Sequence, residues 1–213
     1  MTQEDSLHSA LAAGTADAET ILANVTVNIR LLESVFRGTS SGIARVKFGC
    51  SKALLLLSIR RPGLLCGKID RIVELLDSEN RILRWNAIAM VGNLAAVDRS
   101  NQVRGCLHKL FKFISGGELI TANNAILALG KIGRAIPDKR GLIASQLIAV
   151  EDCRFPTAEC RNISIGKAIL ALKMFVDPGN AGASVVEFVR RQTGNPRAAT
   201  ARKAKAFLRK LSV

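Results

Sequence analysis

The chain has 213 residues, of which 48% are hydrophobic and only 4% aromatic, and its formal net charge is +14. The hydrophobic fraction excludes a globally disordered chain, and the length allows a substantial buried core. With eight Phe, one Trp and no Tyr, that core must be built from aliphatic residues and Ala, which favours helix-on-helix packing over a sheet sandwich.

The positive charge is concentrated in the C-terminal half. Residues 1–29 contain four acids and no Lys or Arg, residues 1–106 carry a net charge of +3, and residues 107–213 carry +11. Such asymmetry bears on partners and solubility rather than on fold. It indicates an anionic partner for the C-terminal half.

Hydrophobic periodicity predicts helices along most of the chain. Residues 1–16 are polar and rich in Ala, and we expect a frayed segment or a short helix there. A single repeat domain over residues 17–213 follows, with one helix at 18–36 and the next at 43–59. The predicted helix pairs occupy residues 18–59, 64–97, 102–135, 139–176 and 183–211. Turns containing Gly or Pro separate the helices, because proline cannot continue a helix and glycine suits the position past its end.

The second helices of these pairs can be aligned on a shared small residue. This residue, position 0 below, is Cys50, Ala87, Ala125, Ala168 and Ala204 in the five pairs. Position +4 is Leu54, Val91, Leu129, Leu172 and Leu208, and position +7 is Leu57, Leu94, Ile132, Phe175 and Leu211. Positions 0, +4 and +7 share one helix face. A period of 36 to 43 residues with two helices per unit is typical of an α-solenoid.

Residues 75–94 show the repeat most regularly. They contain Leu75-Leu76-Asp77, Ile82-Leu83-Arg84-x-x-Ala87 and Val91-Gly92-Asn93-Leu94, and Ala125-x-x-Ala128-Leu129-Gly130-Lys131-Ile132 repeats the last part. This pattern resembles the HEAT-repeat family, in which an acidic residue lies in the turn and a basic residue enters the second helix. Asp77 and Arg84 match these two positions, whereas the other repeats carry Lys47, Ala122, Ile165 and Ala201 at the Arg84 position.

The resemblance implies an all-α fold, a right-handed α-solenoid of about five HEAT-like, armadillo-like helix pairs. It also implies that the second helices line the concave face. Positions −1, +5 and +6 would then form a groove that grades from apolar, through amide, to basic. The predicted partner-binding residues are Trp85, Asn86, Asn93, Asn124, Lys131, Lys167, Lys173, Lys203, Arg209 and Lys210. Two alternatives stay open: the polar ladder is an ordinary solvated helix face, and Trp85 is a core residue.

Catalytic and metal-binding motifs are not found in the sequence. It contains no phosphate-binding loop, His-Glu-x-x-His or Gly-x-Ser-x-Gly, and its two histidines are His8 and His108. The five cysteines are odd in number and form no Cys-x-x-Cys, which favours free buried thiols in a reducing compartment over zinc. The longest apolar run, residues 53–57, is far shorter than the roughly 20 residues that span a bilayer. We therefore expect no catalytic residue, no metal, no cofactor and no membrane contact, and a cytoplasmic location.

These observations predict a non-enzymatic HEAT-like repeat scaffold that binds an acidic protein or peptide through its concave face. The alternative is a nucleic-acid-binding solenoid whose basic groove contacts the phosphate backbone. The low aromatic content weighs against single-stranded nucleic acid, which stacks on aromatic rings. HEAT-like DNA alkylation-repair glycosylases share a basic groove, but this chain has a single Trp and no acid evidently placed among groove aromatics. That third hypothesis is the weakest.

Overall fold

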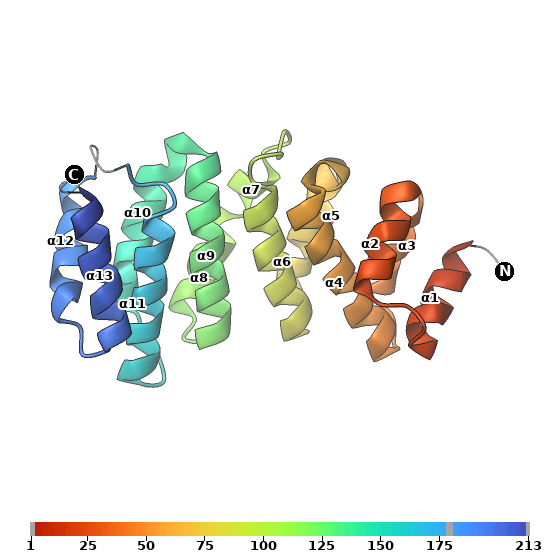
Figure 1. The fold of residues 1–213 in the computed structure, drawn as a ribbon, viewed down its shortest axis with the longest axis horizontal. Helices are drawn as coiled ribbons and strands as arrows, with labels where there is room; N and C mark the ends of the chain where they lie inside the picture. Colours follow the sequence, from red (N-terminus) through yellow and green to blue (C-terminus); the bar gives the residue numbers. More distant parts are fainter. Residues whose placement is uncertain (1–2, 178–180, 212–213) are drawn as a thin grey trace. The chain divides into compact units, whose positions relative to one another are not determined.

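The structure is a computed structural model that describes residues 3–177 and 181–211. These residues form helices joined by short turns, with no strand among them (Figure 1). The chain divides into two compact units, residues 1–102 and residues 103–213, and each is described by itself below.

The first unit contains six α-helices. They are α1 (Gln3–Ala13), α2 (Ala18–Val27), α3 (Leu31–Gly38), α4 (Ala44–Arg60), α5 (Ile69–Glu74) and α6 (Arg81–Leu94). The short 3-10 helices η1 (Pro62–Lys68) and η2 (Leu75–Asp77) flank α5, so the first half of the predicted pair at 64–97 is three short helices rather than one. Helix α7 (Gln102–Gly105) begins at the boundary between the units.

The predicted single helix over residues 18–36 is wrong. Two helices, α2 and α3, are separated there by a turn in which the Asn28 side chain accepts a hydrogen bond from the Arg30 backbone N–H at 3.1 Å. Asn side chains favour turns because they can bond the backbone two residues on. Val27 is 91% exposed and Ile29 48% exposed, so the apolar pattern runs through this turn without marking a buried face.

Helices α1 and α2 pack on α3 and α4 more than on each other. Helix α2 packs along α4, as α6 does, and α1 packs against α3 and α4 (Figure 1). Leu7 and Leu11 of α1 are buried, so residues 3–13 are a packed helix rather than a frayed segment. The Nε2 atom of His8 lies 3.0 Å from the Ser34 carbonyl oxygen. Because a carbonyl can only accept, Nε2 carries the proton of this hydrogen bond.

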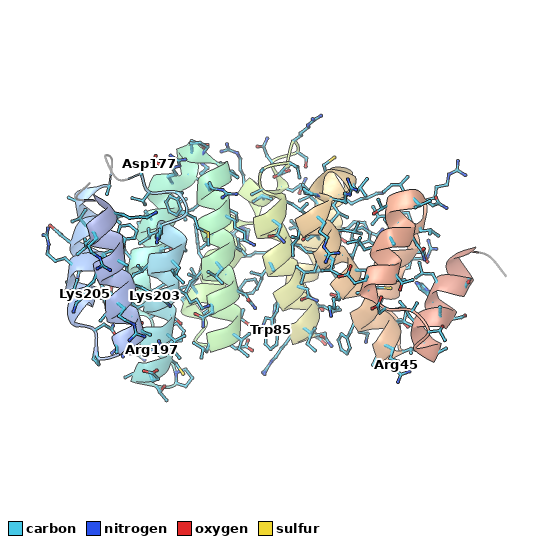
Figure 2. All side chains as sticks on the ribbon, in the orientation of Figure 1. Arg45, Trp85, Asp177, Arg197, Lys203 and Lys205 are labelled. Carbon is cyan, nitrogen blue, oxygen red and sulfur yellow. The ribbon has the colours of Figure 1, made fainter. Side chains whose placement is uncertain are left out.

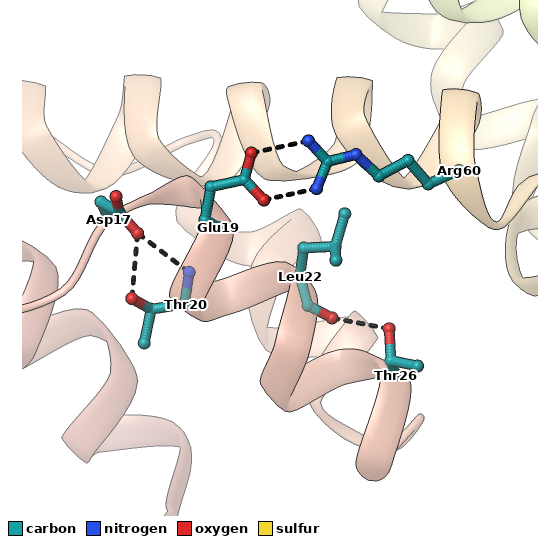
Figure 3. A network of polar contacts seen from close by, with 6 residues as sticks. All are labelled: Asp17, Glu19, Thr20, Leu22, Thr26 and Arg60. Atoms are coloured by element: carbon teal, nitrogen blue, oxygen red, sulfur yellow. Dashed lines mark hydrogen bonds and ion pairs between the residues drawn. The ribbon is translucent and has the colours of Figure 1, made fainter.

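Polar contacts fix the start of α2. The Asp17 carboxylate accepts hydrogen bonds from the backbone N–H and the hydroxyl of Thr20, both at 2.9 Å, and so caps the helix (Figure 3). These bonds hold the pKa of Asp17 below its usual value. Glu19 accepts two hydrogen bonds from the Arg60 guanidinium, at 2.6 and 2.8 Å, which joins α2 to the end of α4.

The second unit contains three helix pairs in two layers. The first helices are α8 (Leu107–Ser115), α10 (Arg140–Ile148) and α12 (Ala183–Arg191), and the second helices are α9 (Leu119–Ala135), α11 (Ala158–Leu172) and α13 (Ala198–Leu211). Each first helix packs on its own second helix, and the second helices pack side by side, α9 on α11 and α11 on α13. Turns η3 (Pro137–Lys139), η4 (Ala149–Asp152) and η6 (Gln192–Gly194) connect them. The described residues thus form five packed pairs, α3–α4, α5–α6, α8–α9, α10–α11 and α12–α13, in agreement with the predicted number.

The aligned apolar positions form the cores. All five residues at position 0 are fully buried, and so are Leu54, Val91, Leu129 and Leu172 at position +4. Leu208 is only partly buried, and the side chain of Leu211 lies outside the described residues. The repeat alignment is thus confirmed at the level of burial.

The cysteines are free thiols with different exposure. Cys50 and Cys106 are buried as predicted, Cys153 and Cys160 are half-buried, and Cys66 is exposed. Burial raises the pKa of Cys50 to about 12. Among the described residues no helix is long and apolar enough to cross a membrane, and no three potential metal ligands come together.

Candidate functional site

Neighbouring second helices meet with a constant offset in each unit. Asn86, at position −1 of α6, bonds Ser51, at position +1 of α4. A Cβ on Gly130, at position +5 of α9, would lie 2.8 Å from the Cα of Ala171, at position +3 of α11. In both contacts, a residue on one second helix faces the residue of the next second helix whose aligned position is lower by two. Side chains at position −1 lean back toward the preceding second helix.

The predicted site residues of α6 are involved in contacts between helices. Asn86 and Asn93 are half-buried, and their Nδ2 atoms donate hydrogen bonds to the hydroxyls of Ser51 and Ser58, each at 2.8 Å. Trp85 is also half-buried, so it is neither a full core residue nor a fully exposed one (Figure 2). The structure thus gives the two amides a role in joining α4 to α6, which the sequence did not suggest.

The predicted site residues of the second unit fall into rows. Position −1 holds Asn124, Lys167 and Lys203, all half-buried, and position +6 holds Lys131 and Lys210, both exposed. Lys173, at the end of α11, is exposed as well. The pKa of Lys131 is lowered, first by loss of surrounding water and then by the nearby charge of Arg134.

Arg209 does not belong to these rows. It stands at position +5, where Gly130 of α9 faces the next second helix. By the same register Arg209 lies on the flank of α13 that is turned away from α11. Figure 2 shows the same separation for Lys205, at position +1, whose side chain lies on the far side of α13 from Lys203.

Lys203 is the centre of a group of cations on α11 and α13. Its Nζ atom lies 3.3 Å from the place that a Cβ would take on Gly166 of α11. Burial lowers the pKa of Lys203, and the charges of Lys167 and Arg197 lower it further. Figure 2 shows Lys203 and Arg197 on the same side of the two helices. The sequence alignment identified Lys167 and Lys203 but missed Arg197 and Gly166. The only sequence signal for these two was that they lie close to the basic residues at position −1.

Four carboxylates of this unit lie near the ends of helices and bind arginines. Arg104 donates two hydrogen bonds to Asp138, at 2.6 and 2.8 Å, and Arg197 Nε donates one to Glu159 at 2.8 Å. The further ion pairs are Arg191–Glu151 and Arg140–Asp177. Helices α9 and α13 contain no acid. Within the described residues, no carboxylate forms an ion pair with Lys167 or Lys203.

We call the surface formed by Lys131, Lys167, Lys203 and Lys210 the lysine face. Of its members, Lys167 and Lys203 form no ion pair with a carboxylate of the described residues, unlike the arginines at the helix ends. Lys167 and Lys203 are half-buried, and the Lys203 ammonium nitrogen lies against Gly166 of α11. Such a surface attracts anions and repels cations.

Comparison with known proteins shows the fold. No family model matches the sequence, and no curated protein matches it. The solved structures similar to it include a designed armadillo repeat protein, YIII(Dq)4CqI, with 18% identity over 96% of this chain and 90% of that chain and a TM-score of 0.61. Computationally designed armadillo repeat proteins for modular peptide recognition have 17% identity over 95% and 90% of the two chains, with a TM-score of 0.62.

A third similar structure is the designed armadillo repeat protein YIII(Dq.V1)4CPAF in complex with the peptide (KR)4. It is 14% identical over 97% of this chain and 90% of that chain, with a TM-score of 0.64. At these identities the likeness concerns the fold alone. It confirms the prediction of an all-α solenoid of the HEAT and armadillo type.

Proposed function

We propose that the protein is a non-enzymatic repeat scaffold that binds an acidic peptide or protein segment on the lysine face of its second unit. The separation of charge carries this proposal. Four acids of the unit are paired with arginines near the helix ends, while Lys167 and Lys203 on the second helices have no carboxylate partner among the described residues. A solvated face of average composition would mix both signs, as most protein surfaces do.

The similar solved structures support a peptide as the ligand. One of them holds the basic peptide (KR)4, and others were designed for modular peptide recognition. This chain carries a net charge of +14, so a peptide bound to its second helices would have the opposite sign to (KR)4. In the proposed arrangement these helices form the concave face, and the peptide runs across them.

The size of the face sets the length of the test peptide. Three packed helices about 9 Å apart span about 18 Å, which an extended chain covers with about six residues. A fluorescein-labelled peptide of about 12 alternating Glu and Gly residues therefore leaves room at both ends. Fluorescence anisotropy with the full chain then gives its Kd, with a peptide of Lys and Gly as the negative control.

A pair of charge-matched variants makes the test specific. We expect Lys167→Met combined with Lys203→Met to weaken binding at least about tenfold, or 1.4 kcal/mol. Lys112→Met combined with Lys205→Met removes the same charge from α8 and from the far flank of α13, and we expect a change of less than about twofold. Equal losses in the two double variants would refute the lysine face and indicate non-specific attraction.

The nucleic-acid alternative is tested in the same titration. A double-stranded oligonucleotide would bind more tightly than the acidic peptide if the phosphate backbone were the natural ligand, and its Kd would rise steeply with salt. That result would replace the proposed function. We expect weaker oligonucleotide binding, because the cations of the lysine face are confined to three helices.

A further inference from the structure

Cations from α11, from α13 and from the residue before α13 lie near Gly166. Gly166 has no side chain, and Lys203 Nζ lies 3.3 Å from the place where its Cβ would be. Lys167 follows Gly166 directly in the sequence, and its charge acts on Lys203, as does that of Arg197. Thr200 packs against Gly166 between the two helices, with its hydroxyl 2.6 Å from the same Cβ position and donating to the Asn162 carbonyl at 2.8 Å.

Arg197 has hydrogen-bonding capacity left after its ion pair. Its Nε atom donates to Glu159 Oε1 at 2.8 Å, and its two terminal nitrogens form no hydrogen bond with a described residue. A guanidinium carries five N–H donors in one plane, so these nitrogens present donors to a second acceptor. Planar donors of this kind suit the oxygens of a phosphoryl group or carboxylate.

The charged side chains near Gly166 favour a bound dianion. Lys167, Lys203 and Arg197 contribute three positive charges, and Glu159 is the single carboxylate of α11. Two positive charges therefore remain uncompensated. One carboxylate of a bound peptide would balance half of this charge, whereas a phosphorylated side chain, with a charge of about −1.5 to −2 at pH 7, would balance nearly all of it.

We infer that Lys167, Lys203 and Arg197 form a subsite for a phosphoryl dianion carried by the acidic segment. This inference rests on the proposed function, since it names the group that the lysine face binds best. The three cations would each approach a different oxygen of the group. The positive charges of Lys167 and Lys203 repel each other, and no carboxylate offsets this repulsion. A bound phosphoryl dianion would offset it.

Three versions of one acidic peptide test the subsite. They carry Ser, Glu or phosphoserine at the central position, and their Kd values for the full chain are compared by fluorescence anisotropy at pH 7.5. We expect the phosphoserine peptide to bind about tenfold more tightly than the Glu peptide. The advantage should shrink toward pH 5.5, because the second phosphate pKa is about 6 while the cations stay charged.

Variants separate the subsite from general attraction. We expect Lys203→Met to remove the preference for phosphoserine over Glu, and Lys205→Met, on the other flank of α13, to preserve it. We expect Arg197→Lys, which keeps the charge and loses the planar donors, to reduce it at least about threefold. Circular dichroism confirms that each variant is folded. A preference that survives Lys203→Met would overturn the subsite.

The possible failures are distinguishable. Tight binding of Glu and phosphoserine peptides with equal Kd would overturn the subsite and leave the proposed function intact. If no peptide binds, the proposed function fails, and inorganic phosphate then tests the subsite alone. A saturable shift of the Gly166 amide resonance on adding phosphate, at constant ionic strength, would support an anion site there. No shift at Gly166 would exclude one.

Discussion

The Nδ2 atom of Asn86 donates a hydrogen bond to the Oγ atom of Ser51, 35 residues earlier in the chain, at 2.8 Å. Seven residues further on, Asn93 bonds Ser58 at the same distance. The Ser58 hydroxyl donates in turn to the Leu55 carbonyl, so it accepts and donates at once. Two equal contacts, two helical turns apart, thus connect α4 to α6.

We expect Asn86→Ala and Asn93→Ala each to lower the free energy of unfolding by about 1 kcal/mol, because each removes a partly buried hydrogen bond and leaves a buried serine hydroxyl without this donor. Urea denaturation measures the change. Asn24→Ala, at an exposed position of α2, is the matched control and should be neutral or slightly stabilising. A double-mutant cycle of Asn86→Ala and Ser51→Ala should give a coupling energy of about 1 kcal/mol. A coupling near zero would contradict the contact.

Replacing Gly130 or Gly141 of the second unit by alanine should change the free energy of unfolding in opposite directions. A Cβ on Gly130 would lie 2.8 Å from both the Ala171 Cα and the Met174 Sδ, so Gly130→Ala must push α9 and α11 apart. We expect a loss of about 1–3 kcal/mol in unfolding free energy. Gly141→Ala, in α10, meets nothing within 4 Å and should gain about 0.5–1 kcal/mol from helix propensity. Thermal or urea denaturation of both variants checks the pair, and stabilisation by Gly130→Ala would refute the close approach.

The ion pair of Arg104 and Asp138 makes stability depend on pH. Hydrogen bonds from Arg104 lower the pKa of Asp138 from 3.8 to about 2. Because the folded pKa is the lower one, the contribution is fully present above pH 3.8 and is lost as the pH falls toward 2. We expect the thermal midpoint of the wild type to fall more over this range than that of Asp138→Asn, which has no such carboxylate to titrate. Parallel pH curves for the two proteins would show that this pair contributes nothing.

Several features of the fold could be predicted from the sequence because one physical signal determines them. The small residues at position 0 recur at helical spacing with apolar residues four and seven places later, and all five are fully buried. The break at Asn28 was missed because Val25 and Ile29 continue the helical spacing across a turn that a single side-chain hydrogen bond stabilises. The packed helix α1 was missed because residues 1–16 are rich in Ala and polar groups, and only Leu7 and Leu11 indicate a buried face.

The candidate site was predictable only in part. The alignment placed Lys167 and Lys203 at equivalent positions. The structure brings the Lys203 side chain against Gly166, the residue before Lys167. It could not tell that Asn86 reaches back to a serine of the preceding repeat, since that contact depends on the offset between neighbouring helices. The same offset separates Arg209 from Lys203, although both are basic residues of α13. Whether these residues bind a partner stays a prediction.

The two asparagine–serine contacts also restrict how α4 and α6 can slide along each other. A shift of one helical turn, about 5.4 Å, would set Ser51 against Ile82 or Met90 in place of Asn86. Ser51 and Ser58 are at most 1% exposed, so water could not replace the lost donors. Apolar helices of similar residues often tolerate alternative alignments, whereas these two have a single alignment in which both hydroxyls are satisfied. A strained or stretched molecule would therefore separate these helices rather than let them slip to a new register.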